Sequence, residues 1–202
     1  MSMQRRAAAR EVVLPVPATF LRHTPMDATA LAVQIDRSRS QLGCALAVGD
    51  AKQILDHAGA LVGMLTAAGR EGEGLSLGLG HVGMARSHST LEESAWLLHS
   101  LATAAQYSND RPRANALFAE ALESARCNGW RRLEHFVLHH WGRSRVEEQD
   151  FDAAERCFVE SRSIRKETDP ALVASSERAL LELAKLRMHG GTQAQSKGPG
   201  AV

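Results

Sequence analysis

The residues best suited to chemistry form a histidine cluster at 134–141, with the sequence EHFVLHHW. His135 and His139 are four residues apart, so on a helix they share one face at a spacing that can chelate a transition metal. No HExxH glutamate stands between them, and no third ligand is certain. Such pairs are common on long helices, so we expect groove or interface histidines, with metal binding as the lesser alternative.

A glycine-rich stretch at 78–83 (GLGHVG) fits the GxGxxG pattern of dinucleotide-binding loops. That function requires a preceding strand in a βαβ unit, whereas this stretch lies in a region of helical periodicity. We therefore expect close approach of two helices at Gly74 and Gly78. Four glycines in one helix cost roughly 3–4 kcal/mol relative to alanine, so the helix expected at 73–88 is either tightly packed or the softest element.

No other catalytic motif is present: the 202 residues contain no GxSxG, Walker loop or paired-cysteine site. The three cysteines, Cys44, Cys127 and Cys157, are widely spaced, which indicates neither a disulfide framework nor a zinc ribbon and fits a reducing compartment. Nothing in the sequence supports catalysis directly, and we expect no cofactor.

Composition limits the fold and the partners. The chain is 44% hydrophobic and only 4% aromatic, and alanine and leucine dominate it, which favours an all-α protein of closely packed helices. With 24 basic and 23 acidic residues, the net charge of +1 argues against direct binding of nucleic acid or acidic membranes. No run approaches 18 apolar residues, and the short apolar run near the N-terminus is no secretory signal, so we expect a cytoplasmic protein.

A 40-residue period organises the chain. Asp110 and Asp150 occupy matching turns between helices, and each is followed after four residues by an alanine and after eight by a phenylalanine. Twelve positions before each alanine stands a small residue of the preceding helix. The repeated structural positions are Ala102, Ala114, Phe118, Gly142, Ala154 and Phe158.

The period predicts helix starts near residues 51, 91, 131 and 171. We expect helix pairs at 51–88, 91–128 and 131–166, flanked by helices at 27–48 and 170–188, in one domain at 25–189. Residues 1–24 carry four arginines and one glutamate and are expected to form a flexible basic arm. The glycine-rich end at 190–202 is expected to be a disordered tail.

The segment 150–158 (DFDAAERCF) resembles the second-helix opening of the tetratricopeptide repeat, and Trp141-Gly142 resembles the Leu-Gly of its first helix. The resemblance covers roughly 50–188. With a period of 40 instead of 34 residues, it is to the longer-helix version found in bacterial regulators and kinesin light chains. It implies about eight helices stacked in antiparallel pairs as a right-handed α-solenoid, with the first helices lining a concave groove.

The groove face of the expected first helices carries aromatic, histidine and charged side chains. In one copy these are Trp96, His99, Thr103 and Tyr107, and in the next Phe136, His139, Arg143 and Glu147. His99 and His139 are one period apart, so stacking should bring them close together. We expect aromatic anchors with Arg143 as the anion-pairing group, and anion binding that tightens as the histidines are protonated near pH 6–7. The alternative is that Trp96 and Phe136 pack between repeats.

The function expected from these residues is that of a protein- or peptide-binding module, an adaptor or regulatory sensor in a bacterial cytoplasm. Its partner would carry an acidic segment or a C-terminal carboxylate, and a homodimer is compatible with this function. The alternative is a small enzyme or metal-binding protein that uses His99, His135 and His139.

Overall fold

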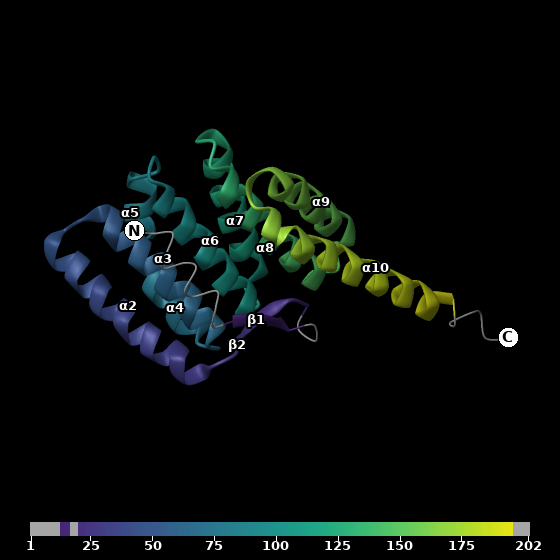
Figure 1. Ribbon diagram of the computed structural model, residues 1–202, viewed down its shortest axis with the longest axis horizontal. Helices are drawn as coiled ribbons and strands as arrows, with labels where there is room; N and C mark the ends of the chain where they lie inside the picture. Colours follow the sequence, from purple (N-terminus) through teal and green to yellow (C-terminus); the bar gives the residue numbers. More distant parts are fainter. Residues whose placement is uncertain (1–12, 17–19, 196–202) are drawn as a thin grey trace.

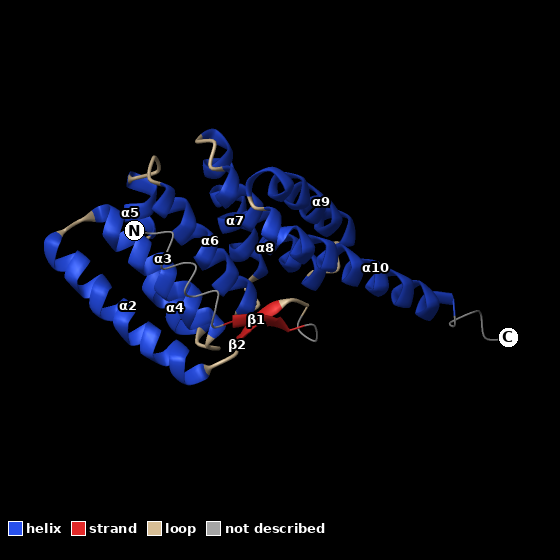
Figure 2. Cartoon of the chain, in the orientation of Figure 1, coloured by secondary structure: helices blue, strands red, loops and turns tan. Residues whose placement is uncertain are grey.

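The computed structural model describes residues 13–16 and 20–195, and its body is made of α-helices (Figure 1). The described elements are, in chain order, β1 (Val13–Val16), β2 (Arg22–Pro25), α2 (Ala28–Val48), α3 (Ala51–Ala67), α4 (Glu71–Leu79), α5 (Val82–Ser87), α6 (Glu92–Tyr107), α7 (Arg111–Cys127), α8 (Arg131–Glu147), α9 (Phe151–Thr168), the 3-10 turn η2 (Pro170–Leu172) and α10 (Val173–Gln195). The expected all-α class is confirmed. The described β-structure is one antiparallel hairpin, which pairs Val13 with Pro25 and Val16 with Arg22 (Figure 2).

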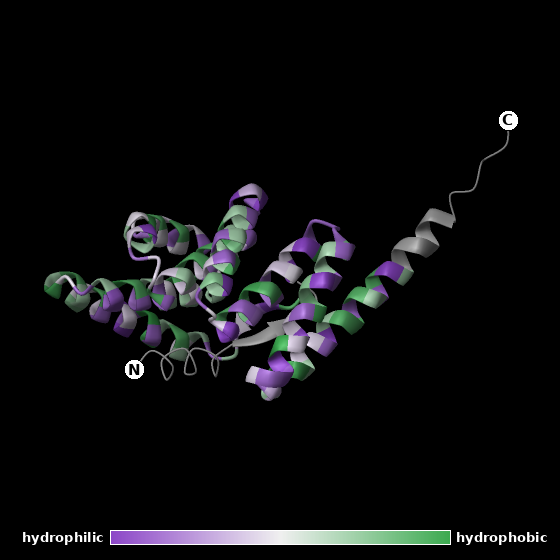
Figure 3. Ribbon diagram, turned by 90° about the horizontal axis from the view of Figure 1, so that it is seen from above, coloured by the Kyte–Doolittle hydropathy of each residue, from purple (hydrophilic) through white to green (hydrophobic). Residues whose placement is uncertain are grey.

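Helices that follow one another pack as neighbours, and the first helices of successive pairs also touch. The pairs are α3 with α4, α6 with α7, and α8 with α9, while α3 packs against α6 and α6 against α8. Helices begin at Ala51, Glu92, Arg131 and Val173, within two residues of the positions that the period predicts. Hydrophobic and hydrophilic residues alternate along the helices, as expected where each buries one side and exposes the other (Figure 3). The right-handed sense of the stack remains a prediction.

The turns that close each first helix repeat in the backbone as well as in the sequence. Gly69, Asn109 and Gln149, spaced 40 residues apart, adopt left-handed φ angles of 72°, 62° and 62°. In the second and third pairs, Asp110 and Asp150 follow this turn, and the side chain of each accepts a hydrogen bond from a backbone N–H in the first turn of the next helix. The cap and the turn together fix where each second helix begins.

Small residues let the helices of each pair approach closely. All six repeated positions expected from the sequence are buried. A Cβ atom on Gly142 would lie 2.6 Å from Cε1 of Phe158, and one on Gly78 would lie 2.6 Å from Cδ2 of Leu101. The expectation of close helix approach at Gly74 and Gly78 is therefore confirmed, since a Cβ on Gly74 would also lie only 3.3 Å from the Val62 carbonyl oxygen.

The prediction of a single helix at 73–88 is wrong. The structure divides it into α4 and α5, with Gly80 and His81 between them. Glycine has a poor helix propensity, and here three glycines fall within six residues, so packing holds α4 against α3 while the helix ends at Gly80. The imidazole Nδ1 of His81 lies 3.0 Å from the Leu77 carbonyl oxygen, where it satisfies one carbonyl of the helix end.

Two glycine-to-alanine substitutions test the close contact in the third pair. Gly142→Ala should lower the free energy of unfolding by about 1–2 kcal/mol, because overpacking against Phe158 outweighs the gain in helix propensity. The matched control is Gly43→Ala in α2, where a Cβ would meet nothing within 4 Å. This control should raise stability by about 1 kcal/mol. Urea denaturation of both variants measures the difference, and equal stabilisation by both would contradict the contact.

The chain termini differ in part from the sequence expectation. Residues 13–16 and 22–24, expected in a flexible arm, belong to the hairpin, and the side chain of Leu21 is only 3% exposed. Residues 1–12 and 17–19 of the expected arm lie outside the described residues. At the other end, α10 continues to Gln195, six residues into the expected tail, and 196–202 lie outside the described part. No helix in the described part is long and apolar enough to cross a bilayer.

Candidate functional site

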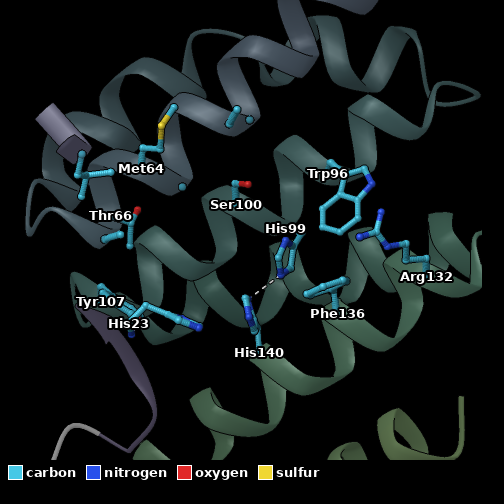
Figure 4. Close-up of a pocket in the computed structure, with 15 residues that line it drawn as sticks. His23, Met64, Thr66, Trp96, His99, Ser100, Tyr107, Arg132, Phe136 and His140 are labelled. Atoms are coloured by element: carbon cyan, nitrogen blue, oxygen red, sulfur yellow. Dashed lines mark hydrogen bonds between the residues drawn. The ribbon is translucent and has the colours of Figure 1, made fainter. Parts of the chain in front are cut away.

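A cavity of about 210 Å³ lies on the face formed by α3, α6 and α8, and we call it the first cavity (Figure 4). Small residues of α3 line one side of it. Aromatic side chains line the other side: Trp96 and Tyr107 of α6 and Phe136 of α8. Four of the residues expected in the groove from the sequence, these three and His99, therefore do surround one cavity.

A pair of histidines lies between the aromatic side chains of the first cavity. His99 Nε2 and His140 Nδ1 are 2.8 Å apart, and the two rings stack with centroids 4.7 Å apart (Figure 4). Trp96 contacts this pair edge-on, with its ring centroid 5.5 Å from that of His99, and lies 5.4 Å from Phe136. Burial, reinforced by the nearby Arg143 guanidinium, lowers the pKa of His140 well below its usual range. The cavity is thus lined by rings that are largely apolar.

The prediction that His99 lies beside His139 is wrong, because the neighbour of His99 is His140. The facing residues of α6 and α8 are 41 positions apart in the sequence, one more than the repeat period. One residue corresponds to a rotation of about 100° around a helix. His139 therefore points toward α9, with its ring centroid 5.5 Å from that of Phe158. Thr103 does not line the first cavity, but its hydroxyl lies 3.4 Å from His140 Nδ1.

His135 and His139 share one helix face as expected, but the group between them is a guanidinium. Arg165 of α9 approaches Nδ1 of His135 with Nε at 3.2 Å and Nδ1 of His139 with Nη1 at 3.1 Å. Because arginine can only donate, both Nδ1 atoms accept and both rings are neutral. Burial, and after it the charge of Arg165, lowers the pKa of His139 well below its usual range. The expected titration of His139 near pH 6–7 is therefore wrong.

These contacts separate the three histidines of the enzyme or metal hypothesis. His99 faces the first cavity, whereas His135 and His139 bind Arg165. Among the residues that the structure describes, no group of three or more histidine, cysteine, aspartate or glutamate side chains is placed to hold a metal ion. No observation here favours that hypothesis.

Arg143 lies deeper than its expected role as an anion-pairing group requires. Its side chain is fully buried, and Nη1 donates to the Leu21 carbonyl oxygen at 2.8 Å and to Nδ1 of His23 at 3.1 Å. Nη2 donates to the hydroxyl of Tyr107 at 3.3 Å. Arg143 thus holds the N-terminal segment (20–25) against α6 and α8 and does not line the first cavity.

Glu147 anchors the same segment from the end of α8. Its carboxylate accepts two hydrogen bonds of 2.8 Å from Arg22 and lies 2.7 Å from Nη2 of Arg111. Burial alone would raise the pKa of Glu147, but the hydrogen bonds from the two arginines lower it. The Arg22 guanidinium also lies 4.6 Å from the centroid of the Tyr107 ring. Residues expected to bind a ligand, Tyr107, Arg143 and Glu147, therefore bind a part of the chain itself.

The N-terminal segment divides the groove face into two cavities. His23, Phe136 and His140 line both the first cavity and a second cavity of about 200 Å³. The second cavity is otherwise bordered by α9, η2 and α10. Sequence reasoning missed His23, His140 and Arg165. His23 lies in a segment without periodicity, and Arg165 stands near the end of a helix whose contacts with α8 depend on their crossing geometry.

The fold and the cavities define an all-α protein of paired helices with a cavity of about 210 Å³ on the face of its first helices. Neither a family model nor a curated protein matches the chain. Among solved structures, the chain is similar to that described as the crystal structure of BtubC (BKLC) from P. vanneervenii, with a TM-score of 0.62 and 15% identity over 86% of this chain and 77% of that one. At this identity the likeness shows a shared helical fold.

Proposed function

We propose that the protein is a binding module that takes an apolar anchor side chain of a partner protein or peptide in the first cavity, as an adaptor or regulatory sensor of the tetratricopeptide type. The observation that carries the proposal is the aromatic lining of this cavity opposite a side of small residues. Aromatic side chains in a preformed pocket are the usual centres of binding energy in recognition surfaces.

The dimensions of the first cavity fit one anchor. Its volume of about 210 Å³ is below the roughly 300–1,000 Å³ of cavities that enclose whole drug-sized ligands. The side contributed by α3 includes Gly59, Ala60, Gly63 and Ala67, whose small side chains leave the space open. An aromatic or large aliphatic side chain could therefore stack on Trp96 and Phe136 while the rest of its chain stays outside.

The charges around the first cavity favour an anchor without charge. Burial lowers the pKa of His140 well below its usual range, and the one arginine that lines the cavity, Arg132, lies over Phe136 with its guanidinium 5.9 Å from the ring centroid. Arg132 is also 4.0 Å from the Asp169 carboxylate, and its side chain is 34% exposed. An acidic residue beside the anchor could pair with Arg132 at the edge of the cavity, whereas its centre offers only rings, hydroxyls and aliphatic groups.

Filling the cavity tests this function. A Cβ on Gly63 would meet only Oγ of Ser100, at 4.0 Å, so Gly63→Leu can place its side chain in the cavity without a backbone clash. We expect peptides selected from a random library on the wild-type protein to share an aromatic or large aliphatic residue. Their Kd should rise at least tenfold for Gly63→Leu, as measured by the fluorescence anisotropy of labelled peptides, because the anchor is excluded.

Gly72→Leu is the matched control, because Gly72 lies in α4 with nothing within 4 Å of its Cβ position and does not line the cavity. This variant should bind the selected peptides like the wild type. Selection of no peptide, or equal binding by Gly63→Leu and Gly72→Leu, would overturn the proposed function.

A further inference from the structure

The second cavity, which the proposed function does not use, is lined by three arginine residues. They come from three helices: Arg143 from α8, Arg165 from α9 and Arg178 from α10, which lie side by side in Figure 1. The remaining lining residues are neutral side chains, among them Ser175 and His139. As far as the structure describes the chain, no carboxylate lines this cavity. A cavity whose charged lining residues are all cations has the electrostatics of an anion site.

The charge of Arg143 is buried without an opposite charge. The side chain is fully buried, and its acceptors are a carbonyl oxygen, an imidazole nitrogen and a phenol oxygen, all of them neutral. Within the described residues it forms no ion pair with a carboxylate, and its Nε has no hydrogen-bond partner. A buried ion is normally compensated by a charge of the opposite sign. The described acceptors of this arginine are therefore all neutral groups.

Arg165 and Arg178 also line the second cavity and add to the positive charge around it. Arg165 is 2% exposed, and its Nη1 lies 2.8 Å from the hydroxyl oxygens of both Ser175 and Ser176. Arg178 is exposed, so its guanidinium can move to meet a ligand that enters from solvent. The imidazole of His139 contributes no positive charge of its own, because Arg165 donates to it.

We propose that the second cavity binds a phosphate group, either as inorganic phosphate or as the phosphate of a small monoester. Three guanidinium groups match an anion of two charges better than a single carboxylate, and planar guanidinium groups bind phosphate oxygens in pairs of hydrogen bonds. Arg178 is the residue that contacts the anion directly, and the buried Arg143 and Arg165 hold the positive potential that attracts it. The site shares a wall with the anchor cavity, formed by His23, Phe136 and His140, but it does not depend on the proposed function.

Ligand-dependent stability of the full chain tests the site. Inorganic phosphate should raise the Tm of the wild-type protein in a saturable manner, beyond the effect of sodium chloride at equal ionic strength, because a ligand of the folded state shifts unfolding. Arg178→Ala should weaken the apparent affinity at least fivefold. Arg156→Ala, an exposed arginine of α9 outside the cavity, should respond like the wild type.

Parallel titrations with glycerol phosphate and acetate identify the ligand. Tighter binding of glycerol phosphate than of inorganic phosphate would support a monoester site, and the reverse order would support free phosphate. Acetate that binds as tightly as phosphate would overturn the phosphate assignment. A response to phosphate that equals the response to sodium chloride, or that survives Arg178→Ala unchanged, would overturn the site itself.

Discussion

Arg143→Ala should lower the free energy of unfolding by about 2–5 kcal/mol, the range for truncating a large, fully buried side chain to alanine. The substitution leaves the Leu21 carbonyl oxygen and the Tyr107 hydroxyl without their donor, and it opens a void where a fully buried side chain stood. The sequence alone predicts a different result for this variant, namely weaker ligand binding in an intact fold. Urea denaturation with separate analysis of the midpoint and the m value measures the loss.

Arg132→Ala is the control for this prediction, because Arg132 lies on the same helix with its side chain 34% exposed and its nearest carboxylate at 4.0 Å. A surface pair of this kind contributes at most about 1 kcal/mol. If Arg143→Ala were as stable as Arg132→Ala, the guanidinium of Arg143 would not hold the N-terminal segment. An anion bound in the second cavity would make the loss of unfolding free energy in Arg143→Ala larger in phosphate buffer. The predicted loss does not require a bound anion.

The repeated parts of the fold could be predicted because each rests on local chemistry. Asp110 and Asp150 cap helices with their own side chains, and a turn residue with a positive φ precedes each of them. The burial of Ala114 and Ala154 follows from their four-residue spacing to those caps. These caps and turns are specified by residues close to them in the sequence. The same residues return after 40 positions, so the repeat can be recognised from the sequence alone.

The candidate site could be predicted only in part, because its decisive contacts join residues far apart in the sequence. Trp96 and Phe136 were found on the correct face from helical periodicity. The pairing of Arg22 with Glu147 spans 125 residues and involves a segment with no periodic pattern. The pairing of His99 with His140 depends on a one-residue offset between α6 and α8. The way in which these two helices cross sets this offset, and the amino-acid sequence of either helix does not reveal it.

The second large effect is a loss of stability in mild acid. Lowering the pH from 7.5 to 5.5 should decrease the free energy of unfolding by about 2–3 kcal/mol, because His139 and His140 have pKa values well below 6.5 in the folded protein. The unfolded chain binds a proton on each ring as the pH falls below about 6.5, whereas the folded protein does not, so unfolding takes up protons. Each ring then contributes about 1.4 kcal/mol at pH 5.5. Burial is the main cause for both rings, and the charges of Arg165 and Arg143 oppose protonation further.

Two variants show whether these rings are responsible. His140→Asn, which keeps a polar atom near the position of Nδ1, should remove about half of the loss between pH 7.5 and 5.5. His88→Gln, at an exposed position, should leave the loss unchanged. Glu147 does not interfere in this range, because its pKa is lowered from 4.5 and its ion pairs weaken only in stronger acid. A loss below 1 kcal/mol in the wild type would mean that the rings are protonated while the protein is folded. The two histidines would then titrate near pH 6–7, and Arg165 could no longer donate to His139.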